Sequence, residues 1–542
     1  MISQRFTRIS FHALTLAMLS APGALYAANV PEGTVLSATQ ELVRNNGSEP
    51  ASLDPHKVES NVEFSIIRDL FDGLIAIRQD GSVEPRLAQT WENKDNTVWI
   101  FHLRPGITWS DGTAITAKDF VWSWQRLVNP KTASPYASYP GNMHIENAAQ
   151  IAQGKADPQS LGVRALDDNT LEVRLTQPNA AFLPMLAHPS LVPLDPILIN
   201  RFGDKWTKPE HIVTSGAYKI SEWIVNEKIV AVRNARFWDN GATVINKVTY
   251  LPISSETADV NRYRAGEIDI TNTIPVNQFA QLKKTLGDQV SVTPLLSTYY
   301  YQFNTTKPPF NDPRVRRALN MALDKEIIAS KVMGQGQRPA WLASQPEIGG
   351  VTLSAPDYAA WPHEKRINEA KKLLKEAGFD DAHPLSFNLL YNTMETHQRI
   401  AIAVSSMWKK NLGVEAKLQN QEWKTMLDTM HTGNFDAVRY AWIADYDDAS
   451  TFLNPFRTGD SENTTQYSNP VYDEALRRAA AAGDLSERGR YYQQAETLLG
   501  EDVPAIPVYY YVRTHLVKPW VGGFAPDRLG YFLTKDLYIK QH

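Results

Sequence analysis

The chain contains no cysteine in 542 residues, and this absence limits how such a chain can be held together. It excludes disulfide frameworks, cysteine-ligated zinc or iron–sulfur centres, thiol nucleophiles and a lipid attached to an N-terminal cysteine. The fold must therefore rest on hydrophobic cores, for which a content of 43% hydrophobic residues is sufficient. At about 150 residues per domain, the length predicts roughly three or four domains.

The first 27 residues have the pattern of a secretory signal peptide. Arg5 and Arg8 are the only charged residues before the apolar stretch 11–19, and small residues follow up to Ala27 and Ala28. The apolar stretch is too short to span a bilayer. We therefore predict export of the protein, with cleavage after Ala27.

Neither charge nor hydropathy favours a nucleic acid or a membrane as partner. The formal net charge is −4 and becomes −6 once the two leader arginines are removed. This balance gives no electrostatic reason to bind nucleic acid or an anionic membrane. The best candidate for a further membrane segment is 178–194, but it carries four prolines and His188. We expect an exported, soluble protein.

Hydrophobic periodicity predicts both strands and helices. Strand 97–103 has apolar residues on both faces, which is typical of a buried strand. Thr116 and Asp119 predict the start of a helix that ends before Asn129. In the second half, helices and strands alternate, which indicates α/β layering. The other predicted strands are 171–175, 229–232, 247–251, 414–418 and 505–512, and the other predicted helices are 312–328, 367–377, 400–412 and 425–430.

Motifs of common enzymes are absent from the sequence. It has no nucleotide-binding glycine loop, no H-E-x-x-H zinc motif and no G-x-S-x-G nucleophile elbow. His144 and Glu146 lack a third metal ligand nearby in sequence. The acidic run 445–448 fails the calcium-loop pattern, because Ser450 stands in place of the required glycine. No metal or cofactor site is predicted.

Aromatic residues in polar company are the positive signal. The 14 Trp and 22 Tyr, without a catalytic motif, favour a ligand cleft over a plain scaffold. Segment 439–445, RYAWIAD, sets Asp445 among apolar residues, where a carboxylate needs a cationic partner. From this segment alone, the favoured interpretation is a protein lysine or arginine as partner, or solvent. The alternative is the ammonium group of a ligand.

Ten short motifs are distributed over the whole chain after the predicted signal peptide. They are SLDPHK (52–57), LAQTW (87–91), ITWSDG (107–112), TAKDF (116–120), SGAY (215–218), NRYRAGEID (261–269), KPPFND (307–312), WKKN (408–411), QEWK (421–424) and VKPW (517–520). In this order they resemble the extracytoplasmic solute-binding proteins of peptide ABC importers. They are most similar to the oligopeptide-binding and murein-peptide-binding branch of that family.

The resemblance implies an α/β protein with the two-lobed periplasmic-binding-protein (Venus-flytrap) fold, whose lobes close around a ligand. It also implies three domains, one of them discontinuous. The expected division is 28–71, 196–297 and 513–542 for the discontinuous lobe I, 72–195 for domain II and 298–512 for domain III. In the family the peptide is extended, its main chain pairs with strands of the protein and its side chains enter hydrated pockets.

Eight positions match the family's contacts with peptide. Asp445 stands where the family holds the α-ammonium group, which reverses the preference drawn from the segment alone. The other matching positions are Trp442, Tyr511 and Tyr136 around the peptide, Glu59 near a side-chain pocket, Arg439 and His397 for a ligand carboxylate, and Trp423 as a pocket wall.

One position departs from the family pattern. Some members use a further arginine for the C-terminal carboxylate of the ligand, and Met430 occupies that position here. One interpretation is a preference for murein-derived peptides or for a narrower set of peptides. The other is that Met430 merely fills space while Arg439 is sufficient. The sequence does not choose between them.

The resemblance thus implies a monomeric periplasmic receptor that captures oligopeptides, delivers them to a membrane ABC permease, and needs neither catalysis nor a cofactor. One alternative is a secreted hydrolase acting on peptides or glycans with Asp447 and Asp448, although adjacent side chains usually point apart. Another is a receptor for nickel, haem or a sugar. The nickel version would need a histidine cluster, which the sequence does not show.

Overall fold

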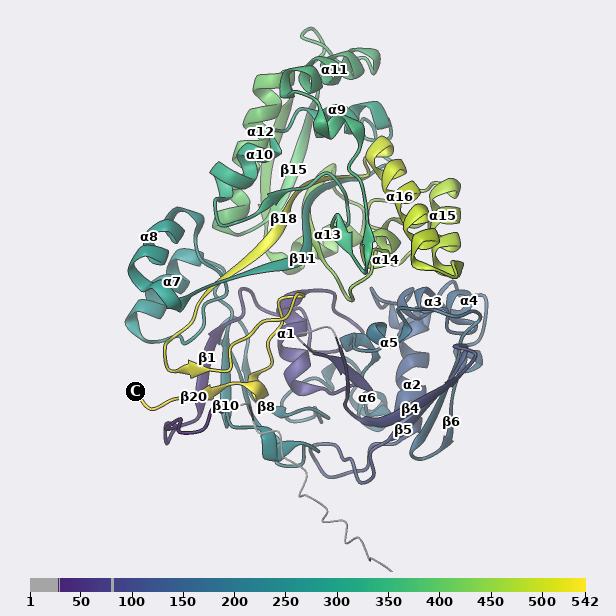
Figure 1. Ribbon diagram of the computed structural model, residues 1–542, viewed down its shortest axis with the longest axis vertical. Helices are drawn as coiled ribbons and strands as arrows, with labels where there is room; N and C mark the ends of the chain where they lie inside the picture. The colour runs from purple at the N-terminus through teal and green to yellow at the C-terminus, as the bar shows by residue number, and fades with distance from the viewer. Residues whose placement is uncertain (1–27, 29, 79–81) are drawn as a thin grey trace, which may run out of the picture.

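The computed structural model describes residues 28, 30–78 and 82–542, so the predicted signal peptide, residues 1–27, lies outside the described residues. The chain forms two lobes, one above the other in Figure 1. The lower lobe contains one large hydrophobic core, and the upper lobe contains one core on each face of its sheet. Among the described residues, no helix is both long and apolar enough to cross a membrane.

The lower lobe contains a four-stranded sheet of order β1-β10-β9-β8. β1 runs parallel to β10, and the other pairs are antiparallel. Apolar side chains on β9 and β10 hold the sheet against the core, with Ile229, Ala231 and Val248 buried. The bounds are β1 Glu41–Asn45, β8 Tyr218–Ile224, β9 Lys228–Arg233 and β10 Lys247–Leu251, so the predicted strands 229–232 and 247–251 are confirmed.

A second four-stranded sheet of the lower lobe has the order β4-β5-β7-β6 and is antiparallel throughout. Its strands are β4 Ala88–Lys94, β5 Val98–Leu103, β6 Val163–Asp167 and β7 Thr170–Arg174. The expectation that both faces of 97–103 are buried is wrong. Trp99, Phe101 and Leu103 are buried, whereas Val98 and Ile100 are only half-buried. Helix α2 covers one face of the sheet and leaves the other partly open.

Helix α2 (Ala117–Val128) begins and ends as the sequence predicts. Thr116 N donates to Asp119 Oδ2 at 2.7 Å, which satisfies one of the free N–H groups at the start of the helix. Phe120, Trp124 and Leu127 are fully buried. The other helices of the lower lobe are α1 Asn61–Leu70, α3 Tyr139–Asn142, α4 Ala148–Ala152, α5 Phe182–Met185 and α6 Pro196–Phe202.

Both ends of the described chain lie in the lower lobe (Figure 1). Gln40 Nε2 donates to Ile539 O at 2.8 Å, and Ile539 N donates to Gln40 Oε1 at 2.9 Å. The chain therefore returns to this lobe after building the upper one. Short strand pairs complete the lobe: β2 Ile75–Ile77 with β3 Val83–Pro85, and β19 Val521–Gly522 with β20 Tyr538–Ile539. The exact boundaries of the three domains stay a prediction.

The upper lobe is built on a six-stranded mixed sheet of order β12-β18-β11-β17-β15-β16. Its centre is a long antiparallel pair, β11 with β18, that reaches from the level of α7 and α8 into the upper lobe (Figure 1). The strands are β11 Val290–Phe303, β12 Arg338–Pro339, β15 Ser386–Asn392, β16 Glu415–Gln421, β17 Ala437–Ile443 and β18 Ala505–Leu516, and a separate pair is β13 Glu347–Ile348 with β14 Val351–Thr352. Predicted strands 414–418 and 505–512 are confirmed.

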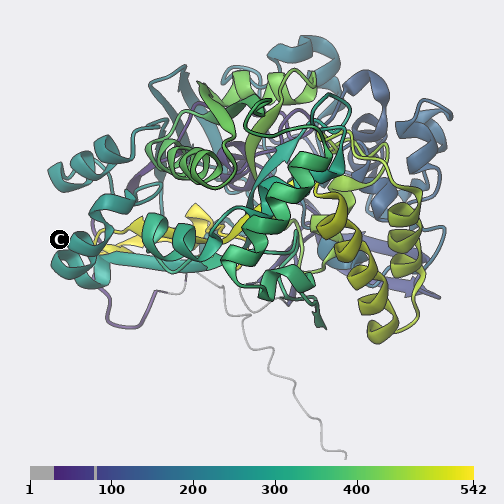
Figure 2. The ribbon, with the colours of Figure 1, turned by 90° about the horizontal axis from the view of Figure 1, so that it is seen from above.

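Helices surround this sheet, and α15 and α16 lie at the opposite end of the molecule from α7 and α8 (Figure 2). Their bounds are α7 Glu256–Ala265, α8 Val276–Leu286, α9 Pro313–Met321, α10 Lys325–Ile327, α11 His363–Glu376, α12 Glu395–Leu412, α13 Trp423–His431, α14 Ser450–Leu453, α15 Pro470–Ala481 and α16 Leu485–Asp502. Predicted helices 367–377, 400–412 and 425–430 correspond to α11, α12 and α13.

The single helix expected over 312–328 is wrong, because α9 ends at Met321 and α10 starts at Lys325. Asp324 has a non-helical backbone conformation, and its side chain accepts from Ile327 N at 3.0 Å. It therefore caps a new helix rather than continuing the old one. A π-helical turn, Ile328–Met333, follows directly.

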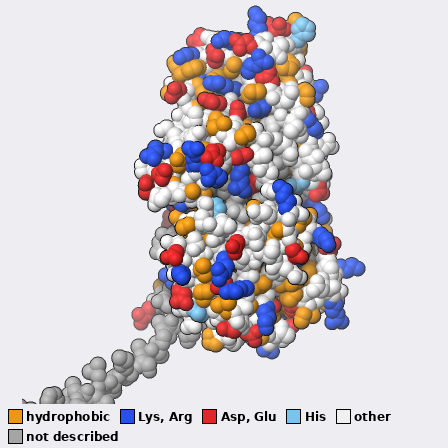
Figure 3. All heavy atoms as spheres, turned by 90° about the vertical axis from the view of Figure 1, so that its right-hand side faces the viewer, with side chains coloured by type: hydrophobic (Ala, Val, Ile, Leu, Met, Phe, Trp, Pro, Cys, Tyr) orange, Lys and Arg blue, Asp and Glu red, His pale blue; other side chains and the backbone are white. Residues whose placement is uncertain are grey.

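The surface of the molecule mixes charges of both signs. On the face drawn in Figure 3, acidic and basic side chains are interspersed over both lobes. No single-sign field that would favour nucleic acid is visible on that face.

Candidate functional site

A cavity of about 240 Å³ lies between the two lobes. The lower lobe contributes residues near the start of α1, and the upper lobe contributes β17, β18 and the start of α12. All eight residues predicted as ligand contacts line it: Glu59, Tyr136, His397, Trp423, Arg439, Trp442, Asp445 and Tyr511. The sequence prediction therefore identified side chains that the fold brings together, although their role in binding stays a prediction.

Asp445 is a nearly buried carboxylate without a permanent cationic partner. Its side chain is 10% exposed, and Tyr136 Oη donates to Oδ1 at 3.3 Å from the other lobe. Among the described residues, the only basic group within 4.0 Å is His188, whose Nε2 lies 3.4 Å from Oδ1. The interpretation based on the segment alone, a lysine or arginine partner or open solvent, is therefore wrong.

His188 cannot neutralise Asp445 near neutral pH. Complete burial lowers the pKa of His188, although the charge of Asp445 opposes this effect. Ser190 N donates to His188 Nδ1 at 3.2 Å, which places the proton of the neutral ring on Nε2, toward Asp445. Sequence reasoning noticed His188 only within a proline-rich segment, and no local motif there indicates a site. The carboxylate thus accepts hydrogen bonds from the neutral hydroxyls of Tyr136 and Thr451 but has no counter-charge.

Strand β17 ends two residues before Asp445 and leaves part of its own edge unpaired. On one side β17 pairs with β11 along its whole length, from Ala437 to Ile443. On the other side, β15 pairs only with Ala437 and Val438. In the pairing of the described strands, residues 439–443 therefore have a free edge, and all of them line the cavity. Such an edge presents main-chain N–H and C=O groups to an incoming strand.

Arg439 provides an unneutralised positive charge in the same cavity. It is 6% exposed and donates to Asn392 Oδ1 at 3.1 Å and to the hydroxyl of Tyr511. Its guanidinium also lies 4.7 Å from the ring centre of Tyr299. No carboxylate of the described residues lies within 4.0 Å of it. Burial would lower the pKa of Arg439, but its tyrosine neighbours outweigh burial and raise it.

His397 and Trp423 also line the cavity. Burial, with the charge of Arg439, holds the pKa of His397 well below its usual value, so the ring is neutral. His397 Nδ1 is buried without a hydrogen-bond partner. Trp423 stacks on Tyr440 with 6.3 Å between ring centres, and its Nε1 is also buried and unpartnered. Each offers a ligand one unsatisfied polar atom.

Glu59 does more than line the cavity near a side-chain pocket, which is the role predicted for it. Glu59, in the lower lobe, is paired with His431 of α13 in the upper lobe, at 2.9 Å between Oε2 and Nε2. It therefore joins the lobes as well as lining the cavity.

Met430 is 1% exposed and belongs to a core cluster of the upper lobe. Of the two interpretations of Met430, the structure favours space filling.

The surroundings of Asp447 and Asp448 and the search for metal ligands bear on the two alternative functions, a hydrolase and a nickel receptor. Asp447 and Asp448 do not act as a pair: Asp447 contacts Arg528 at 2.6 Å, and Asp448 contacts Tyr492 at 2.6 Å. Over the part of the chain that the structure describes, no group of three or more His, Asp or Glu could hold a metal ion. The Asp447–Asp448 pair of the hydrolase alternative is therefore not assembled, and the described residues hold no cluster that would bind nickel.

Known proteins resemble this chain along most of its length. Residues 82–464 match the family described as "Bacterial extracellular solute-binding proteins, family 5 Middle". The chain is 52% identical over 529 residues to the periplasmic oligopeptide-binding protein OppA of Salmonella typhimurium, covering 97% of both chains. It is 45% identical over 520 residues to the periplasmic murein peptide-binding protein MppA of Escherichia coli, covering 95% of this chain and 96% of that one.

A solved structure shows the same arrangement of both lobes. The crystal structure of Haemophilus influenzae OppA in complex with the peptide RPPGFSPFR superposes with a TM-score of 0.92. The two chains are 44% identical, and the match covers 93% of this chain and all of that one.

Proposed function

The chain belongs to the bacterial extracellular solute-binding proteins of family 5, and on that basis we propose that it captures oligopeptides between its lobes and delivers them to a membrane ABC importer. It is a binding protein and not an enzyme, so the hydrolase alternative is not supported. Its relatives are periplasmic, which supports the periplasm as its location and agrees with a signal peptide cleaved after Ala27.

The observation that carries the proposal is the position of Asp445 beside the free edge of β17. A peptide that adds to residues 439–443 as a strand would place its first residue next to the carboxylate, two residues beyond Ile443. The α-ammonium would then supply the counter-charge that the described residues lack. Main-chain pairing gives affinity without reading side chains, so one site can accept many sequences.

Contacts between the lobes support closure around the ligand. Tyr136 of the lower lobe reaches Asp445, and Ser138 and Ser461 donate to each other's hydroxyl oxygens through their N–H groups at 3.1 and 2.9 Å. These bonds cross between the lobes and break if the lobes separate. A peptide bound between the lobes would therefore shift the population toward the closed form.

A free N-terminus on the peptide should be required for tight binding. We expect trialanine to bind, and N-acetyl-trialanine to bind more weakly by about 2–5 kcal/mol, because acetylation removes the charge that faces Asp445. Isothermal titration calorimetry measures both. A peptide with N-methylalanine first, which keeps the charge but adds a methyl group, is the control and should retain more affinity. Equal affinity for the free and acetylated peptides would contradict the proposal.

Peptide affinity should fall as the pH rises past the pKa of His431. Burial would lower the pKa of His431, but the hydrogen bond and charge of Glu59 outweigh it and raise the value above the usual 6.5. The Glu59–His431 pair spans the lobes, so its stabilisation of the closed form is complete below pH 6.5 and is lost as pH rises through the raised pKa.

The pH prediction is checked by titrating tripeptide affinity between pH 6.0 and 7.5 with the parent protein and with His431→Gln. We expect a decline of a few-fold in the parent and a flatter profile in the variant. The ammonium of the peptide remains largely protonated in this range. The same slope in both proteins would show that the pair does not control closure.

A further inference from the structure

The cavity wall formed by β18 carries an arginine that the eight predicted contacts do not include. Tyr509, Tyr511, Arg513 and His515 alternate along β18, so they share one face of the strand, and all four line the cavity. Arg513 is half-buried and accessible from the cavity. Asn61, at the start of α1 in the lower lobe, faces it from across the junction.

The partners of Arg513 are neutral. With its amide oxygen turned toward the guanidinium, Asn61 accepts from Arg513 Nη1 at 2.5 Å and Nη2 at 2.8 Å. In the same orientation, Asn61 Nδ2 donates to Tyr531 Oη at 3.3 Å. These contacts orient the guanidinium and leave its charge uncompensated. No carboxylate in residues 28, 30–78 and 82–542 forms an ion pair with it.

A second arginine reinforces this positive end of the cavity. Arg44 on β1 also lines the cavity, is 6% exposed and has Nε and Nη1 buried without hydrogen-bond partners. Its guanidinium lies 4.0 Å from the ring centre of Phe532, which supplies no formal charge. Burial lowers the pKa of Arg513, and the like charge of Arg44 adds to this effect.

The acidic groups closest to these arginines accept hydrogen bonds from neutral donors and form no ion pair with either arginine. Asp69 accepts from Tyr250 Oη at 2.5 Å and from Thr534 N at 2.9 Å. Asp527 accepts from the backbone N–H groups of Leu529 and Tyr531, each at 2.9 Å. Burial lowers the pKa of His515 to about 3, so His515 adds no charge of either sign. Neither arginine therefore has a carboxylate within 4.0 Å among the described residues, although Asp69 attracts Arg44 and Asp527 attracts Arg513 from farther away.

The charged side chains of the cavity indicate which charged groups the ligand should carry. A peptide with free termini supplies one ammonium group, which suits Asp445, and one carboxylate, which suits Arg439. Arg513 and Arg44 then remain without a carboxylate in ion-pair contact among the described residues. Burying two like charges together is costly unless an opposite charge enters with the ligand.

We propose that the preferred ligand is an acidic peptide, with a side-chain carboxylate received by Arg513 and the charge of Arg44 behind it. This inference rests on the proposed peptide-binding function and names the class of peptide. The guanidinium can donate two hydrogen bonds to a carboxylate, which an amide cannot match. A neutral peptide of the same shape is therefore disfavoured.

The test compares matched tripeptides by calorimetry. Glutamate and glutamine are placed in turn at each position of trialanine, and the affinity ratio within each pair is measured for the parent protein and for Arg513→Gln. We expect at least a tenfold preference for glutamate at one position in the parent. In the variant that ratio should fall to near one. Ratios near one throughout for the parent would overturn the proposal without any variant being needed.

Two further comparisons distinguish a failure of the side-chain proposal from a failure of the proposed peptide-binding function. If Arg513 instead binds the C-terminal carboxylate, C-terminal amidation of the glutamine peptides should weaken binding to the parent but not to Arg513→Gln, and that result overturns the side-chain proposal. If no tripeptide binds the parent, the proposed function itself fails. Circular dichroism confirms that the variant is folded, and Arg513→Lys, which keeps the charge but not the paired donors, should retain part of the preference.

Discussion

Replacing Asp445 with asparagine should weaken the binding of trialanine by about 2–5 kcal/mol, or roughly 30- to 5,000-fold. The substitution keeps the shape of the side chain and removes only its charge. The ammonium group of the ligand would then be buried against Tyr136 and a neutral His188, neither of which compensates it. Calorimetry at pH 7 measures the loss directly.

The control for this substitution is a neighbouring carboxylate outside the cleft. Asp447 is exposed and paired with Arg528 at the surface, so Asp447→Asn should leave peptide affinity unchanged. N-acetyl-trialanine provides the second comparison, because it lacks the charge that Asp445 would meet. It should bind the parent protein and Asp445→Asn about equally. Undiminished affinity of Asp445→Asn for trialanine would remove Asp445 from the site.

Much of the secondary structure could be predicted because local patterns determine it. Strand β10 (Lys247–Leu251) matches the predicted range at both ends, and α2 follows its capping residues. The failures have local causes too. The sequence of 97–103 shows that both faces of the strand carry apolar residues. Whether both faces are buried depends on what packs against each of them, and α2 covers only one face of the sheet. The apolar stripe through 312–328 is continuous, yet the side chain of Asp324 starts a new helix.

The site shows a different limit of sequence reasoning. The eight predicted contacts come from motifs shared with a family, and the fold does place these residues around one cavity. Their charge balance could not be predicted, because it depends on segments far apart in the chain. His188 meets Asp445 across more than 250 positions, and Asn61 meets Arg513 across more than 450. The isolated segment 439–445 even favoured a protein cation for Asp445, which the fold does not provide.

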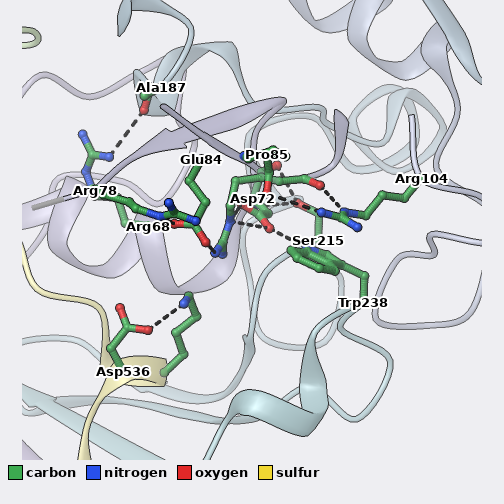
Figure 4. Close-up of polar contacts among 12 residues, drawn as sticks. Arg68, Asp72, Arg78, Glu84, Pro85, Arg104, Ala187, Ser215, Trp238 and Asp536 are labelled. Atoms are coloured by element: carbon green, nitrogen blue, oxygen red, sulfur yellow. Dashed lines mark hydrogen bonds and ion pairs between the residues drawn. The ribbon is translucent and has the colours of Figure 1, made fainter. Parts of the chain in front are cut away.

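Removing the charge of Asp72 should cost about 3–5 kcal/mol of unfolding free energy in the lower lobe. Asp72 Oδ1 lies 2.9 Å from Arg86 Nε, and both side chains are less than a tenth exposed. Trp238 Nε1 also donates to Asp72 at 2.8 Å, and Figure 4 shows the two side chains facing each other. Burial would lower the pKa of Arg86, but Asp72 outweighs it, so Arg86 stays charged.

Asp72→Asn keeps the size of the side chain and leaves the Arg86 cation buried, with Glu84 as its remaining ion-pair partner among the described residues, at 3.8 Å. Urea denaturation followed by tryptophan fluorescence should show the lower-lobe transition at a lower urea concentration. The double variant Asp72→Asn, Arg86→Met removes both charges and should recover part of the loss, because the penalty comes mainly from the unpaired cation. If the double variant were as unstable as the sum of the single variants, the ion pair would not be the cause. The stability would then come from the packing of the Arg86 stem, whose guanidinium lies 5.6 Å from the ring centre of Trp238.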